Sequence, residues 1–166
     1  MIEVIKTERL VLRRFRREDS SRLVTLLNDL DVVRWLTVVP HPYEAAHSTE
    51  FVDAMAAEDD AFAITQEENL IGCISTGSQL GYWVAKAFWG QGYVTEASRA
   101  MISRFFRSDQ QELTSGYHVG NERSKAVLSK LGFKPNGQHR ATAQSTNEDV
   151  IIQDVLLRRV DWEAMQ

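Results

Sequence analysis

The amino-acid sequence predicts one mixed α+β domain built on a largely antiparallel sheet. The chain of 166 residues is long enough for one hydrophobic core and too short for two comfortable ones, so the domain is expected to span residues 1–166. Apolar residues recur at helical spacing up to Asp60 and then switch to the alternation that is typical of strands. Short turns join the strand-like runs that follow, and such turns favour antiparallel pairing.

The N-terminal third predicts a strand followed by helices. Residues 10–15 form an apolar run among arginines and predict the first strand. Either Asp19 or Ser20 can cap the next helix, because a short polar side chain satisfies free N–H groups at a helix start. A second short helix is expected over 31–36 and a third over 44–58. The third is expected to turn these apolar side chains toward the core: Ala46, Phe51, Ala54 and Met55.

The rest of the chain predicts a meander, a crossover and a closing strand. Three short strands are expected, over 61–65, 70–75 and 80–84. A long helix over 92–107 and a strand over 113–119 come next, and the order strand, helix, strand predicts one parallel crossover. A further helix is expected over 121–131. The polar stretch 136–148 is interpreted as a loop, and 150–157 as the last strand.

Composition restricts the class of function. The 19 Lys and Arg residues against 23 Asp and Glu residues give a net charge of −4, so electrostatic binding to nucleic acid or to an anionic membrane is not expected. Cys73 is the only cysteine, which excludes an intramolecular disulfide and a zinc cluster built on cysteines, and we expect no metal. Neither a bilayer-spanning run nor a signal-peptide pattern is found, so the cytoplasm is the expected compartment.

Residues 81–97 form the most informative motif. An apolar run ends at a turn that contains Gly90 and Gly92, and a helix begins directly after it. A helix start leaves backbone N–H groups unpaired, and together with the helix dipole these groups bind anions, usually phosphate. Glycine lets the backbone approach such an anion closely. The spacing matches neither the dinucleotide pattern nor a P-loop, so this motif alone leaves open both a phosphate site and a structural turn.

Several segments, in order along the chain, resemble one family. Tyr82–Val84 followed by Phe88–Ala97 is similar to the acetyl-CoA-binding motif of the GNAT N-acetyltransferases, in the branch named for the ribosomal-protein N-terminal acetyltransferases RimJ and RimL. Thr7–Arg13 resembles the opening strand of that branch, Asn121–Phe133 its Asn-x-x-Ser…Leu-Gly-Phe helix, and Asp149–Trp162 its closing strand. The resemblance implies a central, mostly antiparallel sheet of about six to seven strands that splays between the fourth and fifth, with helices on both faces.

The resemblance also implies acetyl-CoA as co-substrate. Backbone amides of the turn would hold the CoA diphosphate, and the residues concerned are Trp89, Gly90, Gln91, Gly92, Tyr93, Val94 and Thr95. Backbone groups near Trp83 and Val84 would pair with the pantetheine arm like an added strand, and an N–H there would stabilise the oxyanion. Val94 replaces the usual small residue and is tolerable if its side chain points into the core. The side chains of Tyr82 and Trp83 are interpreted as core packing.

Asn121 and Ser124 have local roles and implied ones. Asparagine is a favoured helix N-cap, and a serine in the first turn can bond to nearby backbone. The resemblance implies that Asn121, through its side chain or the adjacent backbone, reaches the pantetheine. It also implies that Ser124 assists the departing thiolate as an acid or hydrogen-bond donor. Many GNAT enzymes use a tyrosine for this step, but no tyrosine follows Asn121, so Ser124 is the predicted catalytic residue.

The implied reaction is direct attack of a neutral primary amine on acetyl-CoA. A peptide α-amine has a pKa of about 7.7–8 and needs little help, whereas a lysine-type amine has a pKa of about 10.4. A water relay is therefore sufficient for an α-amine. His118 and His139 are the candidate general bases, each with a structural role as the alternative.

The acceptor is either a protein N-terminal α-amine or a small-molecule amine, with no nucleic acid or membrane partner. It is expected to enter between residues 30–60 and 136–148. Three acidic residues there could attract a cation or, as is more common, simply solvate a helix: Glu44, Glu50 and Asp53. Another acyl-CoA donor such as succinyl-CoA is a further interpretation. The alternative function is a non-catalytic CoA-binding sensor or scaffold with the same fold. Either a monomer or a homodimer is compatible with the sequence.

Overall fold

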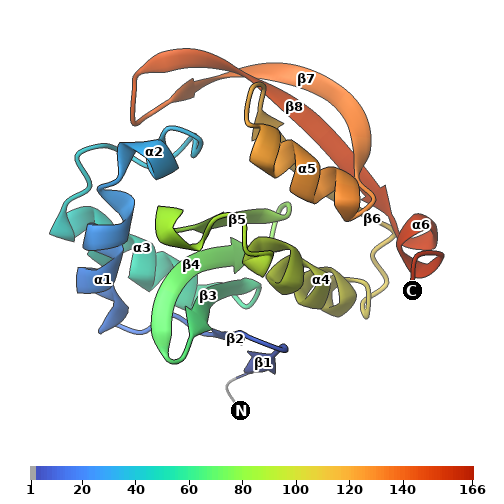
Figure 1. The fold of residues 1–166 in the computed structure, drawn as a ribbon, viewed down its shortest axis with the longest axis horizontal. Coiled ribbons are helices and arrows are strands. Elements are labelled where there is room, and N and C mark those ends of the chain that lie inside the picture. Colours follow the sequence, from blue (N-terminus) through green and yellow to red (C-terminus); the bar gives the residue numbers. More distant parts are fainter. Residues whose placement is uncertain (1–2) are drawn as a thin grey trace.

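The computed structural model describes residues 3–166, and these residues form two antiparallel sheets (Figure 1). The first sheet runs in chain order: β1 (Ile5–Lys6), β2 (Val11–Arg13), β3 (Ala61–Gln66), β4 (Asn69–Ser75) and β5 (Gly81–Val84). The second sheet has the order β6 (Glu112–His118), β8 (Glu148–Arg158) and β7 (Lys134–Ala143). The predicted meander and closing strand are therefore confirmed, while β1 and β7 exceed the predicted number of strands.

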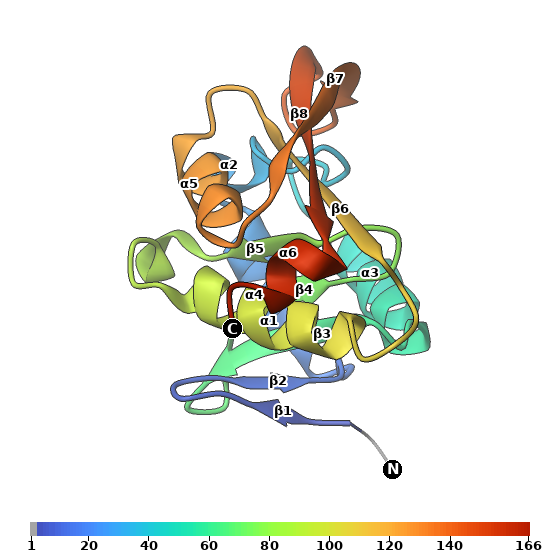
Figure 2. The same ribbon diagram turned by 90° about the vertical axis from the view of Figure 1, so that its right-hand side faces the viewer.

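Helices cover both faces of the first sheet (Figure 2). One face packs on α1 (Asp19–Leu27), α2 (Leu30–Val33) and α3 (Ala45–Ala57). The other packs on α4 (Tyr93–Phe105) and α5 (Glu122–Lys130), which also contact the second sheet. A short 3-10 helix, η1 (Lys86–Phe88), precedes the glycine turn, and α6 (Arg159–Glu163) follows β8. The predicted mixed α/β architecture with helices on both faces is confirmed.

Two details of the N-terminal helices differ from the sequence-based expectation. Neither Asp19 nor Ser20 caps α1, because Asp19 is already helical and its buried carboxylate binds the guanidinium of Arg13 and the backbone N–H of Arg16. In α3 the predicted core residues Ala46 and Ala54 are exposed, Phe51 and Met55 are half-buried, and Ser48 and Val52 are buried instead. Alanine has too little apolar surface to fix which face of a helix is buried.

The interpretation of 136–148 as a loop is wrong. Most of this stretch belongs to β7, which pairs with β8 from Lys134 to Ala143 and leaves only a short connection before Glu148. Nearly every side chain of β7 is exposed, so no apolar alternation marks the strand in the sequence. Backbone pairing with β8 determines its structure. Figure 1 shows the β7–β8 hairpin arching over α5 with its tip near α2.

The two sheets meet at a single parallel bridge between Leu80 and Ser115. The Leu80 N–H donates to the Thr114 carbonyl oxygen at 2.9 Å, and the Ser115 hydroxyl donates to the Leu80 carbonyl oxygen at 2.7 Å. Beyond this point β5 stays with β4, whereas β6 pairs with β8. The predicted splay is confirmed, and it leaves one edge of β5 without a neighbouring strand among the described residues.

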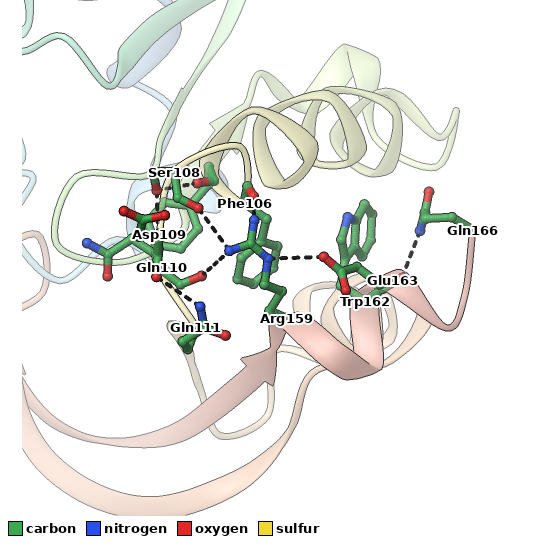
Figure 3. Close-up of polar contacts among 10 residues, drawn as sticks. Phe106, Ser108, Asp109, Gln110, Gln111, Arg159, Trp162, Glu163 and Gln166 are labelled. Carbon is green, nitrogen blue, oxygen red and sulfur yellow. Dashed lines mark hydrogen bonds and ion pairs between the residues drawn. The ribbon is translucent and has the colours of Figure 1, made fainter.

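Arg159 fastens the end of β8 to the connection between α4 and β6 (Figure 3). Its guanidinium donates to the carbonyl oxygens of Phe106 and of Ser108, the latter at 2.9 Å, and to the carboxylate of Glu163 at 3.0 Å. A cation at these carbonyls also complements the negative end of the α4 dipole. The contact therefore fixes the far end of α4 relative to the second sheet.

We expect Arg159→Ala to lower the free energy of unfolding by about 1–3 kcal/mol, because several charge-assisted hydrogen bonds of a half-buried guanidinium are lost. Urea denaturation of the purified protein measures this change. Arg158→Ala is the matched control, because its ion pair with Asp161 is exposed and is expected to contribute little to stability. Equal losses in the two variants would show that Arg159 does not fasten the two parts together.

Candidate active site

The start of α4 presents a row of unpaired backbone N–H groups. Gly90 and Gly92 have φ values of +71° and +81°, a region that favours glycine, and Gly92 is the N-cap of α4. The first bond of the helix runs from the Glu96 N–H to the Gly92 carbonyl oxygen. Within residues 3–166 no hydrogen-bond acceptor is found for the backbone N–H groups of 90–95. This geometry is that of an anion site at a helix N-terminus.

Arg9 braces this turn from the beginning of the chain. Its guanidinium donates to the Gln91 carbonyl oxygen at 2.8 Å and to the Glu96 carboxylate at 2.7 Å, and it lies 4.5 Å from the centre of the Tyr93 ring. The same carboxylate accepts from the Arg9 N–H at 2.7 Å and from the Thr7 hydroxyl at 2.6 Å. Arg9 thus holds the first turn of α4 and places a positive charge beside the anion site.

Glu96 is ionised in this arrangement. Burial alone would raise its pKa, but hydrogen bonds from Thr7 and Arg9 outweigh burial and lower the pKa of Glu96 below its ordinary value. Sequence reasoning assigned no role to Thr7, Arg9 or Glu96 at this turn. Thr7 and Arg9 lie more than 80 residues before the groups that they bind at this turn, so no local spacing indicates the contact.

The Tyr93 side chain is buried and that of Val94 half-buried, whereas Gln91 is exposed. The Val94 side chain is half-buried against the core, so the condition set for it by the sequence is met. The Tyr93 hydroxyl accepts a hydrogen bond from the Gln66 amide at 2.6 Å, and the Gln91 amide donates to the Ala87 carbonyl oxygen at 3.0 Å. Because these side chains are used internally, the turn offers mainly its backbone to a ligand.

Trp89 links the turn to β5 and α5. Its indole N–H donates to the Val84 carbonyl oxygen at 3.0 Å, and the guanidinium of Arg123 lies 3.7 Å from the centre of its ring. The cation–π contact joins the first turn of α5 to the segment that precedes α4. Trp89 therefore lies where β5, α5 and the segment before α4 meet.

The free edge of β5 presents backbone groups of Tyr82 and Val84. The Ala85 N–H points toward β4 and donates to a carbonyl oxygen there at 2.8 Å, whereas the Leu80 N–H points toward β6. Alternate residues of a strand direct their backbone groups to opposite sides. Tyr82 and Val84 therefore share the side of Leu80 and face the space between the sheets.

The backbone of Trp83 faces the other way. Its carbonyl oxygen lies so close to Gly72 of β4 that a Cβ on Gly72 would overlap it. The backbone of Trp83 therefore faces β4 and that of Val84 faces the splay, and contact of either residue with a ligand stays a prediction. The sequence does not reveal which side of a strand is paired.

Asn121 caps α5 as predicted. Its side-chain oxygen accepts from the Ser124 N–H at 3.3 Å, and its own N–H donates to the His118 carbonyl oxygen at 2.9 Å. The Ser124 hydroxyl lies 2.7 Å from the hydroxyl of Tyr82 on β5. Burial raises the pKa of Tyr82 to about 12, so the phenol keeps its proton at neutral pH. The interpretation of Tyr82 as core packing alone is therefore wrong, since its hydroxyl reaches Ser124.

The two candidate bases lie on one face of the second sheet, opposite the same residue of β8, Ile152. His118 is buried, its Nε2 lies 3.0 Å from the Thr37 hydroxyl, and its pKa is lowered by burial, so it is neutral at physiological pH. His139 is exposed and its Nδ1 lies 2.9 Å from the Asp154 carboxylate. His118 thus contacts the segment after α2, whereas the His139 ring is accessible.

The tip of the β7–β8 hairpin contacts the segment that contains α2. The Gln144 N–H donates to the Thr37 carbonyl oxygen at 3.0 Å, and the Ser145 hydroxyl donates to the Val33 carbonyl oxygen at 3.1 Å. The two segments predicted to enclose the acceptor are therefore brought together.

The acidic residues proposed to attract an acceptor are not part of this enclosure. Glu50 and Asp53 are exposed on α3, which packs mainly on α1 and β3, and Glu44 is occupied as the N-cap of α3. Their positions follow from the helix they belong to, so they serve to solvate its outer face.

The described part of the chain contains no group of three or more metal-binding side chains. Cys73 is buried, and burial raises the pKa of its thiol to about 12, as expected for a core residue. No described helix combines the length and hydrophobicity needed to cross a membrane.

Comparison with known proteins identifies the family of the chain. The acetyltransferase (GNAT) domain matches residues 9–134, and the chain therefore belongs to the GNAT acetyltransferase family. It is 26% identical over 178 aligned residues to the Bacillus subtilis protein named "Putative ribosomal N-acetyltransferase YdaF", covering 94% of each chain.

Solved structures are similar over nearly the whole chain. A "Probable acetyltransferase" has a TM-score of 0.84 and 25% identity, covering 96% of this chain and 99% of the other. RimL, described as a ribosomal L7/L12 alpha-N-protein acetyltransferase in complex with coenzyme A, has a TM-score of 0.77 and 18% identity, covering 94% of this chain and 98% of RimL.

We expect Glu96→Gln to lower the free energy of unfolding at pH 7 by about 1–3 kcal/mol, because a neutral amide binds Thr7 and Arg9 less strongly. The pKa of Glu96 is depressed in the folded protein, so its contribution is complete above about pH 4.3, the ordinary value for glutamate, and is lost as pH falls through the folded value.

Urea denaturation at a series of pH values measures this difference between wild type and variant. Glu50→Gln, on the exposed face of α3, is the control and is expected to change stability little at any pH. If the difference in free energy of unfolding between wild type and Glu96→Gln stays the same at acidic pH, the role assigned to the ionised carboxylate is contradicted.

Proposed function

We propose that this protein transfers an acetyl group from acetyl-CoA to a primary amine by direct attack, with a protein N-terminal α-amine as the acceptor. The observation that carries the proposal is the row of unpaired N–H groups at residues 90–95, at the N-terminus of α4 in a chain of the GNAT family. These groups would hold the CoA diphosphate, and the positive charge of Arg9 beside the turn would add to the attraction.

The pantetheine arm would fill the splay between β5 and β6. The backbone groups of Tyr82 and Val84 that face this space can pair with its amides as an added strand would. The Val84 carbonyl oxygen already accepts from Trp89, so the Val84 N–H is the group left to stabilise an oxyanion on the thioester carbon. Asn121 would act mainly by fixing the start of α5, where Ser124 lies.

The acceptor amine would approach from the side of α2 and the hairpin tip. An α-amine with a pKa of about 7.7–8 is partly neutral near pH 7 and can attack without a dedicated base, with water accepting its proton. The name of YdaF and the description of RimL, which refer to a ribosomal N-acetyltransferase and to an α-N-protein acetyltransferase, support a protein N-terminus over a small amine.

The test is release of free thiol from acetyl-CoA by the purified protein in the presence of separate acceptors: peptides with a free N-terminus, the same peptides N-terminally blocked, polyamines and aminoglycosides. The proposal predicts turnover with the free-N-terminus peptides and none with the blocked peptides. Turnover with small amines alone would show that the acceptor is a small amine and not a protein N-terminus. CoA binding without turnover on any acceptor would favour a non-catalytic CoA-binding module.

We expect Gly92→Glu to abolish detectable CoA binding, because it places a carboxylate in the anion site and a Cβ 3.3 Å from Arg9. The variant also places a non-glycine residue at a φ of +81°, which is expected to cost about 1–2 kcal/mol of stability. Isothermal titration calorimetry with CoA measures binding, and circular dichroism confirms folding.

Gly137→Glu separates strain from charge at the site. Gly137 has a φ of +92° and open space around it, so this variant introduces the same side chain and a similar strain on β7. It should bind CoA as the wild type does. A folded Gly92→Glu protein with unchanged affinity would contradict the assigned turn.

A further inference from the structure

The hydroxyl groups of Tyr82 and Ser124 meet beside the splay between the two sheets. Tyr82 lies on β5, Ser124 lies in the first turn of α5, and the two oxygen atoms are 2.7 Å apart. Both residues are half-buried, so this hydrogen bond is partly shielded from competing water. The two hydroxyls therefore lie near the free edge of β5, where the thioester would lie under the proposed function.

The direction of the hydrogen bond follows from the chemistry of the two groups. The phenol is the more acidic hydroxyl and keeps its proton at neutral pH, since burial raises the pKa of Tyr82 to about 12. The Ser124 backbone N–H is already bound to Asn121, which fixes the position of the serine. If Tyr82 donates to the Ser124 oxygen, the serine proton is free to point to a third atom.

We propose that Tyr82 is a positioning residue for Ser124: its hydroxyl donates to the Ser124 oxygen and thereby directs the Ser124 hydroxyl proton toward the sulfur of the departing CoA. This inference rests on the proposed function and concerns its last chemical step. Tyr82 acts through Ser124, which is the group that contacts the sulfur.

When the tetrahedral intermediate collapses, the C–S bond breaks and its electron pair remains on sulfur, while the carbonyl forms again and the amine proton leaves to water. The thiolate accepts a hydrogen bond from Ser124, which accepts one from Tyr82. A thiol has a pKa of about 8.5, so neither hydroxyl has to give up its proton for CoA to leave as a thiolate.

A double-mutant cycle tests the coupling through steady-state kinetics of the full-length protein. We expect Tyr82→Phe to lower kcat by about fivefold to tenfold with the KM for acetyl-CoA within about twofold, because one hydrogen bond to the departing group is weakened. Ser124→Ala is expected to lower kcat by at least as much. Adding Tyr82→Phe to Ser124→Ala should cause no further loss, whereas a purely structural effect of Tyr82 would multiply with that of Ser124→Ala.

The affinity for CoA as a function of pH gives a readout that packing does not change. If the hydroxyl pair stabilises the thiolate, CoA binds more tightly above the pKa of its thiol than below it, while desulfo-CoA, which lacks the sulfur, shows no such rise. We expect this increase in CoA affinity with pH to be smaller in Tyr82→Phe and in Ser124→Ala, and the affinity for desulfo-CoA to be unchanged in both. Calorimetric titrations at a series of pH values measure these affinities.

Tyr117→Phe is the matched control, because it removes the same atom from a half-buried tyrosine on β6 that packs against the same core. This variant should match the wild type in kcat and in the pH dependence of CoA affinity. If wild type binds CoA and turns over but Tyr82→Phe also matches it, the positioning role is overturned and the proposed function stands. If wild type binds no CoA, the proposed function fails and this inference fails with it.

Discussion

The separation of β5 from β6 is the constraint on which the rest of the site depends. The strands are held together at one parallel bridge, Leu80 with Ser115, and then each follows a different partner. An unpaired strand edge with free backbone groups is normally a liability, because it can pair with another chain. Here the edge is short and is bordered by α5 and by the Trp89 indole, so its access is limited. Under the proposed function the acyl donor supplies the missing partner.

The turn at the start of α4 shows how a backbone site is kept in shape by distant side chains. Arg9 and Thr7 bind the carbonyl oxygen of Gln91 and the carboxylate of Glu96, and the side chains of Tyr93 and Val94 pack in the core. Because the ligand-facing groups are backbone, many side-chain combinations can preserve them.

The chemistry proposed for the site comes from elements that are distant in sequence. Val84 and Tyr82 belong to β5, Ser124 to α5, and the acceptor side is formed by the contact between Thr37 and the hairpin. Arg159 stabilises this arrangement from the opposite end by joining the end of α4 to β8. The site therefore depends on the relative position of the two sheets, and every contact that fixes that position contributes to it.

The sequence by itself determined those features that local physics controls. The strands of the meander, the glycine turn, the Asn121 cap and the inward direction of Val94 follow from periodicity, backbone dihedral preferences and capping chemistry over a few residues. Only the tertiary structure decided that β7 is a strand and that Arg9 braces the turn. It also decided that the backbone of Tyr82, and not that of Trp83, faces the splay, and that the Tyr82 hydroxyl reaches Ser124. These features depend on which strand lies on which side and on contacts spanning tens of residues, and no short-range pattern in a single sequence encodes such pairings.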